Sequence, residues 1–224
     1  MRLCFVAFAL VLSACGTTQA EPRIAAGPIA AFDADIARGE SVVSEIGAMA
    51  GRDRLLREII MRGFRTEMTG EERQAYIEGT RHHFDRIDGE NSARLRVIIR
   101  EIGWAELNAL SPHAADQART LISHSSDIAF KREMAATFEP LVRAGRMEGD
   151  YYAMLIDDIA TMENRGQVYG TNFECHHGVY QPKPIEAVET LAARRAEIGL
   201  VPIEEYAARM REMYGECPAD YSGN

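Results

Sequence analysis

Four polar residues in the second half of the chain are the first candidates for chemistry. His124 ends a predicted helix, Asp157 lies in a later one, and Gln167 and Tyr169 follow soon after. An imidazole held by a carboxylate can act as a general base. The sequence therefore predicts that His124 and Asp157 form an acid–base pair. The residues expected to contact a ligand are Gln167, Tyr169, Thr171 and Arg195.

The same residues admit a structural interpretation. Residues 157–171 span a switch from helix to extended chain, where buried polar groups must find hydrogen-bond partners. The chain contains no Gly-x-Ser-x-Gly motif, so a nucleophile elbow is not predicted. A buried polar network and a ligand-binding pocket both remain open as explanations of this stretch.

Histidines and cysteines suggest a metal site only weakly. Cys175, His176 and His177 are consecutive, and His82 and His83 form a second pair. Adjacent residues on a strand point to opposite faces, so one such pair rarely binds a single ion. No His-Glu-x-x-His motif occurs. We expect neither a metal nor another cofactor.

An acidic segment at residues 84–90 has a faint likeness to a calcium loop. It places Asp85, Asp88 and Glu90 close together, but it lacks the alternating oxygen ligands and the closing Glu of an EF-hand. We expect Asp88 to cap a helix instead.

The elements that must position these residues are mostly helices. Capping signals occur at Thr69 with Glu72, at Ser111 before Pro112, and at Asp127. The predicted helices cover residues 33–49, 52–61, 70–84, 88–103, 112–124, 128–144, 149–165, 187–198 and 203–214, with Gly51 interrupting the first two. Alternation predicts a β-hairpin at about residues 167–181. The predicted fold is mainly α: a single-domain helical bundle over residues 31–224, with a small β-hairpin appendage near its C-terminal third.

Several short motifs, in order along the chain, resemble those of a bacterial domain family of unknown function, DUF6624. The matching residues are Gly103-Trp104, His124, Asp157, Gln167, Tyr169-Gly170-Thr171, Arg194-Arg195 and Gly199-Leu200. Positions where the sequence differs from the family pattern are Ala105, Ser123, Asp158 and Asn172. The similarity spans roughly residues 52–206, and it implies no particular activity.

The N-terminus has the pattern of a bacterial lipoprotein precursor. Residues 1–14 contain one Arg followed by an apolar run, which is typical of a signal peptide. Leu12-Ser13-Ala14-Cys15 resembles a lipobox, whose cysteine is lipidated. Gly16 follows rather than the Asp that favours inner-membrane retention. We therefore expect Cys15 to carry a lipid anchor such as palmitate, residues 15–30 to form a tether, and the protein to face the periplasm from the outer membrane.

Charge and cysteine content limit the partners further. The net charge is −9, which opposes binding to nucleic acid. Cys175 and Cys217 remain after processing, and in an exported protein they most simply form a disulfide. The partners we expect are the membrane, through the anchor, and a small-molecule ligand.

Two functions from different classes fit the sequence. The first is a periplasmic binding or accessory module whose polar cluster is structural or recognises a small ligand. The alternative is a hydrolase-like enzyme that uses His124 and Asp157 as an acid–base pair. The oligomeric state does not follow from the sequence.

Overall fold

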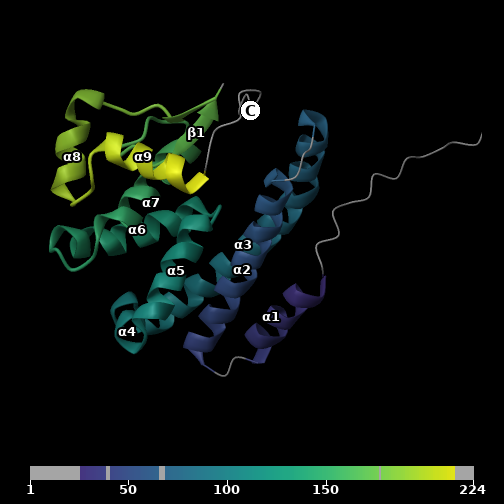
Figure 1. Ribbon diagram of the computed structural model, residues 1–224. Helices are drawn as coiled ribbons and strands as arrows, with labels where there is room; N and C mark the ends of the chain where they lie inside the picture. The colour runs from purple at the N-terminus through teal and green to yellow at the C-terminus, as the bar shows by residue number, and fades with distance from the viewer. Residues whose placement is uncertain (1–25, 39–40, 66–68, 177, 215–224) are drawn as a thin grey trace, which may run out of the picture.

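A computed structural model describes residues 26–38, 41–65, 69–176 and 178–214 (Figure 1). Within these ranges the chain forms nine α-helices and one two-stranded hairpin, which confirms the predicted mainly α fold. Residues 1–14, which are predicted to form a signal peptide, and Cys15 and Cys217 lie outside the described residues. No helix within the described ranges is both long and apolar enough to cross a membrane.

Gly51 does not interrupt the first part of the domain as predicted. Helix α1 covers Ala26–Arg38. Helix α2 covers Val42–Arg65 and runs through Gly51 without a break. A Cβ atom at Gly51 would lie 2.4 Å from the Phe32 ring of α1. The glycine therefore allows α1 to pack closely against α2, and the helix tolerates it.

Helix α3, Gly70–Ile102, is one continuous helix of 33 residues where two were predicted. Its predicted capping box is confirmed, with Thr69 and Glu72 each bonding the backbone of the other. Asp88 lies inside this helix, so its prediction as a cap is wrong. The helix ends at Gly103, whose φ of +80° is unfavourable for residues with a side chain. Helix α3 packs along α2 (Figure 1).

Four helices follow in close succession. They are α4 (Trp104–Leu110), α5 (Pro112–His124), α6 (Ile128–Arg143) and α7 (Gly149–Met162). The predicted caps are confirmed, because Ser111 accepts a hydrogen bond from the Ala114 amide and Asp127 from the Phe130 amide. Their buried faces join α2 and α3 in one core, with Ile46, Leu95, Leu107, Ile122, Phe130 and Phe138 among its fully enclosed residues.

The C-terminal part adds the hairpin and two short helices. Strands β1 (Phe173–His176) and β2 (Val179–Pro182) pair antiparallel, with Cys175 opposite Tyr180. The regular hairpin is shorter than predicted, since Gln167 forms only an isolated bridge with Ile185. A 3-10 turn, η1 (Val188–Thr190), leads into α8 (Leu191–Glu197), and α9 (Ile203–Tyr214) follows. Figure 1 shows these elements gathered beside α6 and α7.

Candidate functional site

Asp157 holds the loop that follows α7. Its side chain is fully buried. Oδ1 accepts hydrogen bonds from the amides of Val168 at 2.7 Å and Tyr169 at 2.8 Å. Oδ2 accepts from the amide of Thr171 at 2.7 Å and from its hydroxyl at 2.8 Å. Burial raises the pKa of Asp157, although these bonds to the ionised form oppose the rise.

Gln167 joins the same loop to the segment after the hairpin. Its Oε1 accepts from the Asn172 amide at 2.6 Å, and its Nε2 donates to the carbonyls of Asn172 and Lys183. The backbone of Gln167 bonds Pro184 and Glu186 in turn. Each polar group of this buried side chain is therefore used inside the protein.

Arg195 closes the network from α8. Its guanidinium is buried and donates to the carbonyls of Tyr169 at 2.5 Å and Val201 at 2.8 Å. It also lies over the Tyr206 ring, with Cζ 5.2 Å from the ring centroid. Together, Asp157, Gln167, Thr171 and Arg195 form what we call the Asp157 network, and their pairing favours the structural interpretation of this stretch.

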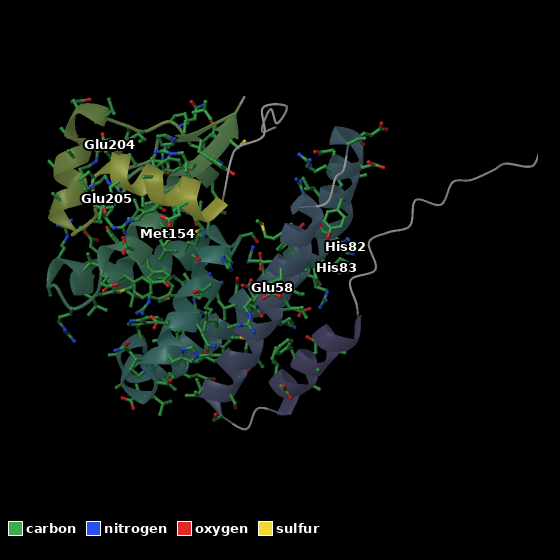
Figure 2. All side chains as sticks on the ribbon, viewed as in Figure 1. Glu58, His82, His83, Met154, Glu204 and Glu205 are labelled. Atoms are coloured by element: carbon green, nitrogen blue, oxygen red, sulfur yellow. The ribbon has the colours of Figure 1, made fainter. Side chains whose placement is uncertain are left out.

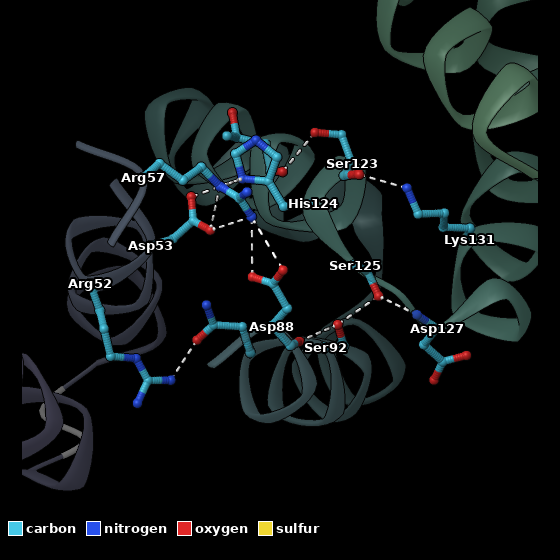
Figure 3. Close-up of polar contacts among 12 residues, drawn as sticks. Arg52, Asp53, Arg57, Asp88, Ser92, Ser123, His124, Ser125, Asp127 and Lys131 are labelled. Carbon is cyan, nitrogen blue, oxygen red and sulfur yellow. Dashed lines mark hydrogen bonds and ion pairs between the residues drawn. The ribbon is translucent and has the colours of Figure 1, made fainter. Parts of the chain in front are cut away.

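His124 does not belong to that network. It ends α5, and its Nδ1 lies 2.8 Å from Oδ2 of Asp53 on α2 (Figure 3). Asp53 precedes it by 71 residues in the sequence. The carboxylate at hydrogen-bond distance from His124 is thus Asp53, whereas the oxygens of Asp157 bond the loop after α7. The structure does not bring the predicted His124–Asp157 pair into a hydrogen bond.

Arg57 connects His124 to a second carboxylate. Its Nε lies 3.0 Å from Oδ1 of Asp53 and 2.8 Å from Nδ1 of His124, and its Nη2 lies 3.1 Å from Oδ1 of Asp88 on α3. We call Asp53, Arg57, Asp88 and His124 the Arg57 cluster. Three helices, α2, α3 and α5, supply its members (Figure 3).

The Arg57 cluster is open on one side. The side chains of Arg57 and His124 are 31% and 29% exposed, while that of Asp53 is only 4% exposed. No described residue forms a hydrogen bond with Nε2 of His124. The cluster therefore has a buried carboxylate at its base and an imidazole nitrogen available at its surface.

The two carboxylates of the cluster have different proton affinities. Burial raises the pKa of Asp88 to about 6, with the charge of Asp53 adding to the rise and Arg57 opposing it. Burial also acts to raise the pKa of Asp53, but the hydrogen bond and charge of His124, and then Arg57, hold that pKa below its usual value. A pair of carboxylates whose pKa values are pushed apart is typical of acid–base sites.

A buried lysine fixes the end of α5 that carries His124. Lys131 donates to the Ser123 carbonyl at 2.6 Å and forms an ion pair with Asp158 of α7. Asp158 in turn accepts from the Asn172 side chain at 3.0 Å, and Asn172 bonds Gln167. This chain of contacts links the Arg57 cluster to the Asp157 network.

Sequence reasoning missed Asp53 and Arg57. Their spacing of four residues on one helix is a signal for an ion pair, which the structure contains. Nothing local connects that pair to His124, because the contact depends on how α2 packs against α5.

The structure describes some of the histidines and cysteines that the sequence singles out. His82 and His83 lie together on α3, with ring centroids 3.7 Å apart (Figure 2). Among the described residues, no group of three or more His, Cys, Asp or Glu is placed to hold a metal ion. Cys175 lies buried on β1, but Cys217 and His177 are outside the described residues, so the Cys175–Cys217 disulfide remains a prediction.

Comparison with known proteins identifies the family. Residues 43–217 match the model of a family of unknown function, DUF6624. This range covers most of the chain, and it confirms the predicted resemblance to this family. No curated protein and no solved structure matches the chain. The protein therefore belongs to the DUF6624 family.

Proposed function

We propose that this DUF6624 protein is a lipid-anchored periplasmic enzyme whose Arg57 cluster performs hydrolase-like acid–base chemistry. The observation that carries the proposal is the 2.8 Å contact between Nδ1 of His124 and Asp53, beside an Nε2 that bonds no described residue. This arrangement keeps the acid–base role expected of His124 and replaces Asp157 with Asp53 as its partner.

His124 is the proposed general base. An ionised carboxylate only accepts hydrogen bonds, so in the proposed tautomer Nδ1 carries the ring proton and donates it to Asp53, whereas in the other tautomer Nδ1 accepts from Nε of Arg57. Nε2 then carries the lone pair and can take a proton from a water molecule as that water attacks a substrate. Asp53 also stabilises the imidazolium that forms, as an orienting carboxylate does in related dyads.

Asp88 and Arg57 supply the complementary roles. Because the pKa of Asp88 is raised to about 6, part of the population keeps a proton near neutral pH. Asp88 donates that proton to the leaving group as the scissile bond breaks. His124 then releases the proton that it took from water, and Asp88 is reprotonated through solvent. The Arg57 guanidinium forms ion pairs with Asp53 and Asp88, and it stabilises the negative charge that develops on the substrate in the transition state.

Hydrolysis of chromogenic carboxylic and phosphate esters tests the proposal directly. His124→Gln should lower kcat/KM by about 10²–10⁴-fold. His113→Gln is the matched control, because His113 lies exposed on the same helix, α5, and should leave the rate unchanged. Equal rates for the two variants, on any ester that the protein cleaves, would contradict the assignment.

The anchor is a separate part of the proposal, supported by the lipobox at Leu12-Ser13-Ala14-Cys15. Cys15→Ala should leave the precursor unprocessed and without lipid. Mass spectrometry of the membrane fraction measures both properties. A lipidated or normally matured variant would show that this reading of the N-terminus is wrong.

The alternative, a binding or accessory module, is favoured by a different observation. A pocket of about 450 Å³ is lined by residues of α4, α5, α6 and α7 and of the turn before α7, none of which belongs to the Arg57 cluster. Pockets of this size commonly hold small molecules. A protein that binds ligands there without cleaving any ester would fit this alternative.

A further inference from the structure

The pocket next to α4 contains a guanidinium held on aromatic rings. Cζ of Arg119 lies 5.1 Å from the ring centroid of Tyr151 and 5.9 Å from that of Trp104. Arg119 also forms an ion pair with Asp116, one turn earlier on α5. Its side chain is only 17% exposed, and its Nε is buried without a hydrogen-bond partner. The cation in this pocket is therefore fixed in place before any ligand arrives.

Two further charges line the pocket at the turn between α6 and α7. Arg146 and Glu148 are both exposed, and both contribute to the pocket wall. Neither forms an ion pair with the other or with another described residue. The pocket thus presents one cation and one anion whose charges are not neutralised within the described part of the protein.

The sum of these charges selects among ligand classes. The lining contains two guanidinium groups, Arg119 and Arg146, and two carboxylates, Asp116 and Glu148. A purely anionic ligand would be repelled by the two carboxylates. A purely cationic ligand could not stack on the aromatic rings, because Arg119 already lies over them, and it would be repelled by that guanidinium. A ligand that carries both signs of charge avoids both penalties.

We propose that this pocket binds a zwitterion with an α-amino and an α-carboxylate end, such as a free amino acid or a short peptide. Arg146 takes the carboxylate, and Glu148 takes the ammonium. The apolar part of the ligand rests against Met147 and the Tyr151 ring, which also line the pocket. This site is separate from the Arg57 cluster and does not depend on the proposed hydrolysis.

Trp104 is the only tryptophan in the chain and lines the pocket, so intrinsic fluorescence reports directly on this site. The experiment uses the whole lipoprotein in detergent and titrates the twenty amino acids and a set of dipeptides. Each ligand is compared with its N-acetyl and its C-terminal amide derivative. We expect a saturable change for a subset of zwitterions, and at least about tenfold weaker binding when either end is blocked.

Charge variants assign each end of the ligand. In Arg146→Gln the free acid and the amide should bind equally, and in Glu148→Gln the free amine and its N-acetyl form should bind equally. Arg100→Gln and Glu205→Gln are controls, because these exposed residues lie on α3 and α9 outside the pocket. The affinities measured in the same titrations show whether the pocket prefers free amino acids or dipeptides.

Three results would overturn the proposal: no saturable change with any zwitterion, equal binding of blocked and free ligands, or unaltered selectivity in both pocket variants. Because the readout is binding at Trp104, these results are independent of whether the Arg57 cluster hydrolyses esters.

Discussion

The Asp157 network and the Arg57 cluster both contain a buried aspartate, and they differ in the groups that surround it. Asp157 is bonded mainly by backbone amides, whose positions are fixed by the loop and whose protons do not exchange with a substrate. Asp53 is bonded by the side chains of Arg57 and His124. The first arrangement fixes a loop in place, and the second can move charge and protons.

Exposure follows the same division. Asp157, Gln167 and Arg195 are all buried, whereas Arg57 and His124 are each about one third exposed on one side of their cluster. Lys131 and Asp158 connect the two regions, so the closed network supports the helix end that carries His124. The rigid Asp157 network therefore helps to position His124 in the Arg57 cluster.

Asp157→Asn should have the largest effect on stability. Both carboxylate oxygens of Asp157 accept hydrogen bonds, but the side-chain NH₂ of Asn can only donate. In the variant this NH₂ faces other donors, so at least one buried donor loses its acceptor. We expect a loss of about 3 kcal/mol or more in the free energy of unfolding, measured by urea denaturation. Asp150→Asn, at an exposed position on the same helix, should change that free energy by no more than about 0.5 kcal/mol. Similar curves for both variants would mean that the network is not structural.

Asp88→Asn should stabilise the protein at alkaline pH. The pKa of Asp88 is higher in the folded protein, about 6, than its ordinary value of 3.8, so the folded state binds more protons between these values. The free energy of unfolding therefore falls as pH rises from about 4 to 6, and the asparagine variant escapes that loss. The gain at pH 8 should be no more than about 3 kcal/mol, and it should vanish below pH 4.

Melting curves of wild type and Asp88→Asn at pH 4, 6 and 8 measure this difference. A variant that is less stable than wild type at pH 8 would show that the ion pair with Arg57 outweighs the cost of burying the charge.

Tyr169→Phe should have the smallest effect of the three. The rings of Tyr169 and Tyr152 pack edge to face with centroids 6.2 Å apart. Burial raises the pKa of Tyr152, and its interaction with the Tyr169 side chain opposes that rise. Phenylalanine keeps the ring contact and loses only the hydroxyl, which should cost about 1 kcal/mol. Thermal unfolding measures the loss, and a gain in stability would indicate a strained, functional tyrosine instead.

Local signals predicted much of the fold, and tertiary contacts decided the rest. The caps at Thr69, Ser111 and Asp127 depend on residues three positions away, so the sequence was sufficient for them. Gly51 illustrates the opposite case, because its role depends on Phe32 of another helix. His124 was recognised by its chemistry, but its partner Asp53 could be found only from the packing of α2 against α5.

The tautomer of His124 tests the central claim most directly. Nδ1 is close to both Asp53 and the Nε of Arg57, so it either donates to the carboxylate or accepts from the guanidinium. Nitrogen-15 NMR of histidine-labelled protein, at a pH where the ring is neutral, distinguishes the two, with Asp53→Asn used to assign the signal. We predict a proton on Nδ1 and an unprotonated Nε2, as a general base requires. A proton on Nε2 would contradict the account, because no lone pair would then face the open side of the cluster.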